Sequence, residues 1–190
     1  QMAGLSINSI ETETLAIVRV LAANNLPPTI IVSIGAINTS LAIIKDGILV
    51  LTYLIPTGGN AITRSIEADF GLTQSQSEEY KKTYGFSKTG AGKKVGKSTE
   101  PILSSILLEI KKALAFYSQK YKDEAIIQQV LLSGGTAKLP GIDLFFAENL
   151  GIETVVANPW KIFANQQIPP DLLNDTVDYT IALGLAMRDL

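Results

Sequence analysis

The sequence predicts an α/β fold, a mixed five-stranded sheet with a helical insert. Three apolar segments rich in β-branched residues lie between residues 30 and 55, with connections too short for parallel crossovers. Short strand-like segments alternate with helical ones in the second half of the chain, which is typical of parallel strands. The segments between these two parts show helical periodicity only. With 46% hydrophobic residues among 190, the chain can bury a core around such a sheet.

The first 25 residues predict a short strand and a helix. The segment Leu5–Ile10 is strand-like, and Thr14–Ala23 has apolar residues at helical spacing. Two prolines in Asn24–Pro28 end this pattern and indicate a boundary.

Three antiparallel strands are predicted next. They are Ile30–Ile34, Thr39–Ile44 and Ile48–Ile55. Asp46 and Gly47 form the dipeptide that favours a tight hairpin turn between the second and third strands. We therefore expect a meander.

Helices are predicted to follow the meander. Asn60–Phe70 is the first, and a second ends at Tyr84, with Gly85 after it. Thr73 and Gln76 have the spacing of a capping box at its start.

A basic loop is predicted after the second helix. The segment Phe86–Lys97 is rich in glycine and lysine, so we expect a mobile surface loop. A long helix is predicted to begin at Ser98–Pro101, because apolar residues then recur along one stripe.

The rest of the chain alternates strand, helix, strand, helix. These elements are predicted at Val130–Leu132, Ile142–Leu150, Thr154–Ala157 and Val177–Arg188. The complete order of elements is that of ribonuclease-H-like domains.

Composition excludes several classes of function. The net charge is -2, so there is no basic face for nucleic acid. The chain has neither cysteine nor histidine, which excludes disulfides, thiolate zinc sites and serine–histidine catalysis. No apolar run approaches the roughly 20 residues that a membrane helix needs.

Two glycine turns are candidates for ligand binding. One, Ser133–Thr136, comes between a predicted buried strand and a helix, where backbone amides can meet an anionic ligand. The other, Ile34–Thr39, is the first hairpin, where Gly35 can offer amides to a phosphate. Each segment alone is also compatible with an ordinary turn.

Two further patterns have weaker or no support. Glu78 and Lys81 lie three residues apart on one helix face, where they could hold two adjacent hydroxyls or form a solvated ion pair. The segment Gly92–Ser98 is similar to a P-loop, but that motif requires a glycine where Ala91 stands, and no strand precedes it.

Taken in order, these segments resemble the C-terminal half of the PilM family of type IV pilus assembly proteins, relatives of FtsA in the actin superfamily. The resemblance runs along nearly the whole chain. The segments that carry it are Val32–Leu41 as second phosphate motif, Ser77–Gly85, Leu131–Gly141 as adenosine motif, Ala157–Trp160, and Tyr179–Arg188 as second connecting helix.

The resemblance implies an actin-like lobe with a defined division. Residues 1–25 would be an inter-lobe connecting strand and helix. Residues 26–58 and 100–190 would form subdomain 2A, and 59–99 the helical insert, subdomain 2B.

The resemblance also implies a set of nucleotide-binding residues. Those near the adenine and α-phosphate would be Gly134, Gly135, Thr136 and Lys138. Those for the ribose hydroxyls would be Glu78 and Lys81. Those facing the phosphates would be Gly35, Ala36, Asn38 and Thr39, with Gly59 and its neighbour Gly58 in the same cleft.

The implied cofactor is ATP, with Mg²⁺ in the whole protein. Relatives usually carry aspartate at the position of Ser33, and a serine cannot replace that charge toward magnesium. The sequence suggests no carboxylate that would substitute. We expect at most slow ATP hydrolysis in a longer protein and none by this chain alone, which lacks the other phosphate-binding lobe.

The implied partner is the cytoplasmic peptide of PilN, bound through the N-terminal half that this sequence does not contain. Other inner-membrane platform proteins of the pilus machinery would also be partners, at the cytoplasmic face of the membrane. We further expect self-association through the predicted helices Thr14–Ala23 and Val177–Arg188, whose apolar surfaces tend to be covered.

Three alternatives remain open from the sequence: an FtsA- or MreB-like cytoskeletal ATPase, a sugar or acetate kinase of the same superfamily, and a structural module that binds no nucleotide. A kinase needs a carboxylate base, and Ser33 argues against one. The nucleotide hypothesis requires Gly35 and Gly134 to lie at the same end of the sheet.

Overall fold

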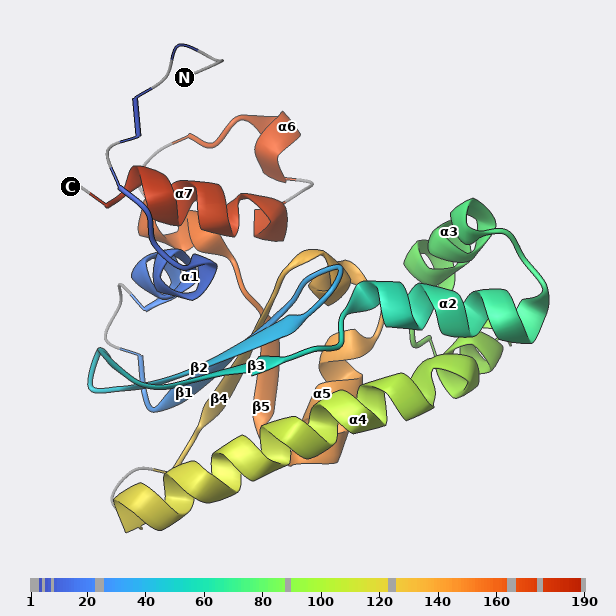
Figure 1. Cartoon of the computed structure of the whole chain (residues 1–190), viewed down its shortest axis with the longest axis horizontal. Helices are drawn as coiled ribbons and strands as arrows, with labels where there is room; N and C mark the ends of the chain where they lie inside the picture. The colour runs from blue at the N-terminus through green and yellow to red at the C-terminus, as the bar shows by residue number, and fades with distance from the viewer. Residues whose placement is uncertain are drawn as a thin grey trace.

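A mixed five-stranded sheet forms the centre of the molecule (Figure 1). The structure is a computed structural model that describes residues 4, 6–7, 9–22, 26–87, 90–122, 126–163, 167–173 and 176–188. The strands are β1 (Thr29–Ile34), β2 (Thr39–Lys45), β3 (Ile48–Ile55), β4 (Gln129–Ser133) and β5 (Glu153–Val156).

The strand order is β3-β2-β1-β4-β5, as an α/β fold with a three-stranded meander requires. The first three strands pair antiparallel, and β4 is parallel to both β1 and β5. Asp46 and Gly47 turn the second hairpin with positive φ values of 52° and 74°. The predicted meander and the predicted parallel half are both confirmed.

Helices cover the two faces of the sheet. On one face lie α4 (Gly90–Tyr121) and α5 (Ile142–Leu150), packed against alternate side chains such as Ile30, Val32 and Ile34. On the other lie α1 (Glu13–Leu21) and α7 (Thr180–Ala186), packed against residues that include Ile31 and Ala42 (Figure 1). Strand side chains alternate between faces, so both hydrophobic clusters follow from the strand sequences.

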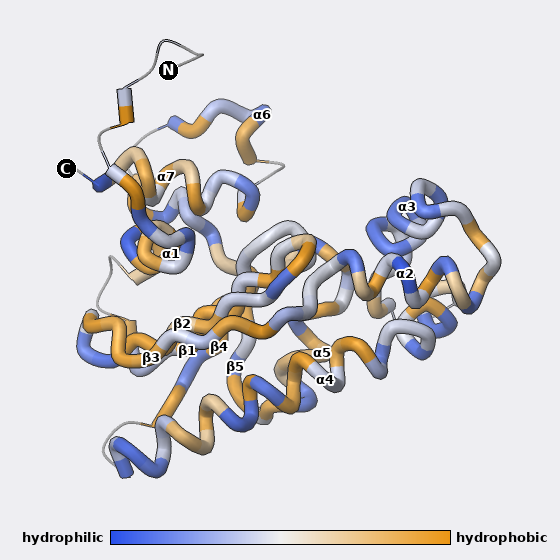
Figure 2. Tube along the Cα trace, viewed as in Figure 1, coloured by the Kyte–Doolittle hydropathy of each residue, from blue (hydrophilic) through white to orange (hydrophobic). Residues whose placement is uncertain are grey.

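The insert after β3 contains α2 (Gly59–Phe70) and α3 (Gln74–Tyr84), which extend from one end of the sheet (Figure 1). The predicted capping box is present: the Gln76 amide donates to the Thr73 hydroxyl at 3.4 Å, and the Thr73 amide donates to the Gln76 side chain at 3.0 Å. Gly85 ends α3, as predicted. Figure 2 shows that α3 is largely hydrophilic, whereas the strands are largely hydrophobic.

The prediction of a loop up to Lys97 is wrong for residues 90–97, because α4 begins at Gly90. Val95 is buried in the main hydrophobic cluster, and Gly92 lies directly against Ser87, so this lysine-rich stretch is amphipathic. Pro101 lies inside the helix rather than at its start. Lys88 and Thr89 are outside the described residues.

The predicted first strand is also not formed: residues 4, 6–7 and 9–10 belong to no strand, while Leu5 and Asn8 lie outside the described residues. Ile7 and Ile10 are exposed, so no neighbouring strand stabilises this segment. The last predicted helix is shorter than expected, since residues 176–179 form a 3₁₀ turn, η4, before α7.

Three short helical segments of the C-terminal half were not predicted. They are η2 (Gly135–Lys138), η3 (Pro159–Phe163) and α6 (Pro170–Leu173). Within the described part of the chain, no helix has both the length and the apolarity needed to cross a bilayer.

Candidate functional site

The two predicted glycine turns lie side by side at one end of the sheet. The parallel register pairs Ser33 of β1 with Ser133 of β4, so the chain leaves both strands at the same level. Gly134 follows with φ of +80°, and a Cβ there would stand 2.6 Å from the Ile34 carbonyl oxygen. Only glycine fits this turn. The arrangement that the nucleotide hypothesis requires is therefore present.

The start of α2 joins the same end of the sheet. The Gly59 amide donates to the Gly35 carbonyl, and the Asn60 amide donates to the Ala36 carbonyl, both at 2.8 Å. A Cβ on Gly58 would lie 2.6 Å from the Gly35 carbonyl oxygen. The first hairpin and the start of α2 approach so closely because Gly35 and Gly58 carry no side chains.

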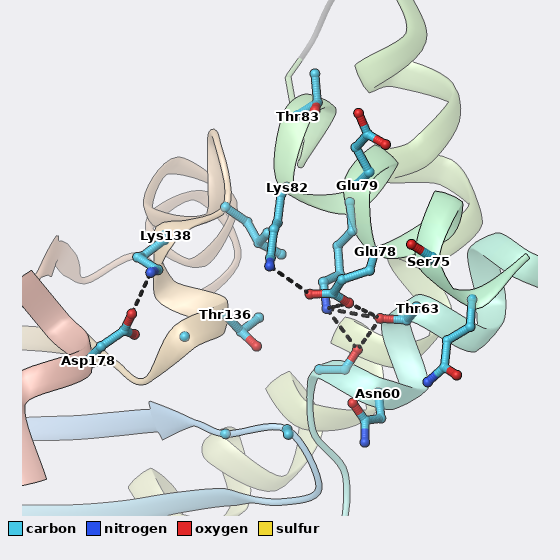
Figure 3. Close-up of a pocket in the computed structure, with 17 residues that line it drawn as sticks. Asn60, Thr63, Ser75, Glu78, Glu79, Lys82, Thr83, Thr136, Lys138 and Asp178 are labelled. Carbon is cyan, nitrogen blue, oxygen red and sulfur yellow. Dashed lines mark hydrogen bonds and ion pairs between the residues drawn. The ribbon is translucent and has the colours of Figure 1, made fainter. Parts of the chain in front are cut away.

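A cavity of about 850 Å³ opens beside these turns, between the sheet end, α2, α3 and η2 (Figure 3). Eight of the residues predicted from the sequence to bind nucleotide line it: Gly35, Ala36, Gly59, Glu78, Lys81, Gly135, Thr136 and Lys138. Its volume lies within the range of small-molecule and cofactor sites.

A smaller cavity of about 370 Å³ adjoins the same turns on the α1/α7 side. Gly134 and Asn38 line it, as do Gly35, Ala36 and Gly135, which also line the larger one. Thr39 lines neither described cavity. Its buried hydroxyl donates to the Thr57 carbonyl at 2.7 Å, so it holds the hairpin to the segment after β3.

Glu78, Lys81 and Thr63 form a hydrogen-bonded group on the far wall of the larger cavity (Figure 3). The Lys81 ammonium is buried and lies 2.6 Å from a Glu78 oxygen. It also donates to the Thr63 hydroxyl at 2.9 Å, and that hydroxyl contacts Glu78 at 2.7 Å. The pair is thus a built part of the cavity wall rather than a solvated surface pair.

The charges of this group support one another. Burial raises the pKa of the Glu78 carboxyl, but hydrogen bonds from Lys81 and Thr63 and the charges of Lys81 and Lys82 outweigh burial and leave the pKa below its ordinary value. Glu78 is therefore an ionised acceptor at neutral pH, and Lys81 is a donor beside it. Such a pair can bind two neighbouring hydroxyls of a ligand.

A second ion pair lies at the boundary of the two cavities. The Lys138 ammonium and the Asp178 carboxylate point toward each other and lie 2.6 Å apart (Figure 3). Asp178 lines both cavities and belongs to η4, directly before α7. This pair joins the predicted adenosine motif to the C-terminal helix.

Sequence reasoning missed several residues of the site. Thr63 and Asn60 could have been found, since they follow the glycine pair at the start of a predicted helix. Glu13 and Asp178 could not, because only the fold brings them beside Ser33 around the smaller cavity. Two carboxylates, those of Glu13 and Asp178, therefore line the same cavity as Ser33.

The described side chains form no metal site of their own. No group of three or more acidic residues that could hold an ion occurs in the described ranges. The lining of the smaller cavity includes two carboxylate residues and three serines.

Comparison with known proteins connects this geometry to a family. The family model described as "Type IV pilus assembly protein PilM" matches residues 5–190, almost the whole chain.

Solved structures show the same fold. A PilM-PilN type IV pilus biogenesis complex matches with a TM-score of 0.81 at 24% identity, over 98% of this chain and 54% of that one. The ethanolamine utilization protein EutJ from Carboxydothermus hydrogenoformans matches with 0.70 at 23%, over 97% and 56%. MreB 5 of Spiroplasma citri bound to AMPPNP matches with 0.69 at 19%, over 98% and 60%. The fold is actin-like, and the chain spans between 54% and 60% of these relatives.

Proposed function

We propose, because the chain belongs to the type IV pilus assembly protein PilM family, that it is the C-terminal nucleotide-binding lobe of an actin-like scaffold for pilus assembly. The observation that carries the nucleotide part is the meeting of two glycine turns and the Glu78–Lys81 pair around one cavity. An FtsA- or MreB-like cytoskeletal ATPase shares the fold, but the family match favours the pilus scaffold.

The proposed orientation of ATP follows from the polar groups of the cavity. The ribose hydroxyls would bind Glu78, which accepts, and Lys81, which donates. The adenine would lie near Gly135, Thr136 and Lys138, which belong to η2.

The phosphates would point to the opposite end of the cavity. The Gly35–Asn38 hairpin lines that end and would face the phosphates, whereas the amides of Gly35, Gly59 and Asn60 already donate to backbone carbonyls. Thr39 is left out of this proposal, because its hydroxyl is engaged with Thr57.

Mg²⁺ would enter with the phosphates. Glu13 and Asp178 could bind its waters from the smaller cavity, beside Ser33. Mg²⁺ would neutralise phosphate charge there. Since Ser33 itself offers no charge, we expect hydrolysis to be slow even in a longer protein.

The division of the chain follows from the same proposal. Residues 1–25 and α7 would connect to a second lobe, 26–58 and 100–190 would be subdomain 2A, and 59–99 subdomain 2B. The α2–α3 insert forms one wall of the cavity. Helix α4 supports this wall, because it packs against both α2 and α3.

The biological role of the whole protein would be that of a cytoplasmic scaffold at the inner face of the membrane. A solved relative is a complex with PilN. We infer that a second lobe binds the cytoplasmic peptide of PilN and that closure of the two lobes on ATP sets whether partners are held. Other inner-membrane platform proteins would join the same assembly.

Calorimetric titration of ATP tests the nucleotide site. We expect weak or no binding to this chain and clear binding to a longer protein that also carries the second lobe, because phosphate contacts come from both lobes. In the longer protein, Lys81→Met should weaken binding at least tenfold, about 1.4 kcal/mol or more.

The neighbouring lysine provides the control. Lys82 also lines the cavity, but its exposed ammonium lies 3.7 Å from Glu78, so Lys82→Met should weaken binding less than Lys81→Met does. Absence of ATP binding in both the short and the long protein would favour a structural module instead.

A further inference from the structure

One edge of the sheet, formed by β3, has no neighbouring strand among the described residues. β3 is the terminal strand of the sheet and pairs with β2, and no strand of the described residues lies on its other side. It has eight residues, whereas β5, at the opposite edge, has four and begins with Glu153. Short or charged edge strands resist pairing with other chains, and a long one invites it.

Apart from one β-bulge near its start, β3 lacks the devices that usually protect an edge. Its sequence, Ile48–Ile55, contains no charged residue and no proline. The pairing with β2 shifts between Ile43 and Ile44, which leaves Val50 as an extra residue. From Leu51 to Ile55 the pairing is regular, so a straight stretch of about 17 Å remains open.

An apolar groove runs beside this regular stretch. It has a volume of about 380 Å³ and lies between β3 and α4. Its lining residues are Leu51, Thr52, Tyr53, Glu109, Lys112, Ala113 and Phe116. Phe116 is 57% exposed and Tyr53 46% exposed, which is unusual for aromatic side chains on a strand and a helix that face each other.

The polar groups of the groove neutralise one another. The Lys112 ammonium donates to Glu109 at 2.7 Å, and the Tyr53 hydroxyl donates to the same carboxylate at 3.0 Å. These bonds fix the Tyr53 ring at one end of the groove. The groove therefore presents apolar side chains without net charge, next to the outer edge of β3.

We propose that this edge binds an extended, uncharged peptide segment of a partner protein as a sixth strand beside β3. Backbone hydrogen bonds to Leu51–Ile55 would hold it, and every second side chain, aliphatic or aromatic, would enter the groove between Tyr53 and Phe116. This surface is separate from the candidate nucleotide site, with which it shares no lining residue.

Size favours a peptide over a second copy of the chain. A five-residue edge is short beside the roughly 20–30 residues that each partner contributes to a stable protein interface. A second copy would also bring its own α4, which packs over β3 through the bond from Tyr53 to Glu109. Two paired β3 strands would lie about 4.8 Å apart, whereas packed helices need about 8–10 Å between their axes. The α4 helices of the two copies would therefore collide.

The test uses a capped, uncharged seven-residue peptide, Gln-Val-Thr-Val-Thr-Val-Gln, and its twin N-methylated on the five central residues. The first can pair as a strand, and the twin has the same side chains without the donors. We expect the first to shift the backbone amide NMR signals of Leu51–Ile55 and to slow their hydrogen exchange. The twin should bind at least tenfold more weakly.

Two variants separate the groove from the rest of α4. Phe116→Ala removes the groove wall and should weaken peptide binding at least fivefold. Leu108→Ala removes an equally exposed side chain (55%) of the same helix that does not line the groove, and should leave binding unchanged. Both residues are exposed, so both variants should fold, as circular dichroism can verify.

Three results would overturn the proposal. One is the absence of any β3 shift at millimolar peptide. A second is equal binding of the N-methylated twin or of the Phe116→Ala variant. The third is a dimer in analytical ultracentrifugation that Phe116→Ala dissociates, because a second copy would then occupy the edge.

Discussion

At the level of single residues, the ammonium of Lys81 governs the charge of the candidate site. It is buried, and it contacts Glu78, Thr63 and the Gly59 carbonyl oxygen at 2.6, 2.9 and 3.4 Å. Disturbing this group is costly, because removing the ammonium leaves its three oxygen partners without their donor, and removing an oxygen leaves the buried charge with fewer partners. The group therefore links α2 to α3 in addition to facing the cavity.

We predict that Lys81→Met raises the pKa of Glu78. Burial, which raises this pKa, stays, while the hydrogen bond and charge of Lys81 that lower it are lost. NMR titration of the Glu78 side chain would measure the shift. Lys82→Met, from an exposed site 3.7 Å away, should produce a smaller rise. Equal shifts in both variants would contradict the geometry described for Lys81.

The lowered pKa of Glu78 also predicts how the stability of the fold depends on pH. Because the pKa of Glu78 in the folded state is lowered from 4.5, its ionised form stabilises the fold above that value. The contribution should disappear as the pH falls through the lower, folded-state pKa. Urea denaturation at pH 7 and at pH 3 should therefore show a smaller acid loss of stability for Glu78→Gln than for the parent chain.

We predict that Gly134→Ala destabilises the chain more than Gly151→Ala. Both glycines have positive φ, +80° and +67°, so both substitutions impose a backbone cost of roughly 1–2 kcal/mol. A Cβ at Gly134 also meets the Ile34 carbonyl oxygen at 2.6 Å, whereas nothing lies within 4 Å at Gly151. Urea denaturation should show the difference. Similar losses for both would mean that the β1 and β4 ends lie farther apart than described.

At the level of elements, the sequence predicted the sheet better than the helices around the site. The strands were predictable because β-branched runs, an Asp46-Gly47 turn and short connections leave few ways to pair. α4 was not predictable at its start, because the glycines of that segment disfavour helix locally, and packing of Val95 against the core decides instead.

The residues of the candidate site also fall into two groups, those that a local sequence pattern predicts and those that only the fold brings to the cavity. Gly35, Gly134, Glu78 and Lys81 were found from motifs, since each stands in a recognisable local pattern. Asp178 reaches the cavity only because η4 lies beside η2 in the fold, and no local pattern records that contact. Thr39 has the right position in its motif, but its hydroxyl bonds inward, which spacing alone does not reveal.

We predict opposite effects for two glycines in the first turns of α4. Gly96→Ala should stabilise the chain by about 0.5–1 kcal/mol, because alanine favours helix and its Cβ would meet only Phe86, at 3.9 Å. Gly92→Ala should destabilise it, because a Cβ there would lie 2.6 Å from the Ser87 side chain. Thermal unfolding of both variants measures this. Two neutral substitutions would indicate that residues 90–97 form a loop after all.

At the level of the whole molecule, the backbones of α1 and α7 approach each other so closely that no side chain fits between them at Gly184. Gly184 packs directly on the Ala16 carbonyl, and a Cβ there would overlap it. The Arg19 guanidinium donates to the Gly184 carbonyl and to both carboxylate oxygens of Glu11. In the proposed two-lobed protein, the segments leading to the second lobe would therefore move as one unit.

The outer surface of this helix pair leads to a prediction about association. Leu15 of α1 and Leu185 of α7 remain exposed, and Ile7 and Ile10 are exposed just before α1. Exposed apolar groups tend to be covered, so we expect the chain to self-associate at high concentration through these residues. Light scattering over a concentration series would detect it.

Two lysine substitutions locate the contact. Leu185→Lys should lower the average mass toward the 20.4 kDa monomer, because it places a charge inside the apolar surface. Leu144→Lys should not, since that residue is equally exposed (56% against 50%) but lies on α5, across the sheet from α7. Self-association that survives Leu185→Lys but is lost with Phe116→Ala would place the contact at the β3 edge instead. A monomer at every concentration would mean that the exposed side chains of α1 and α7 are too dispersed to hold two copies together.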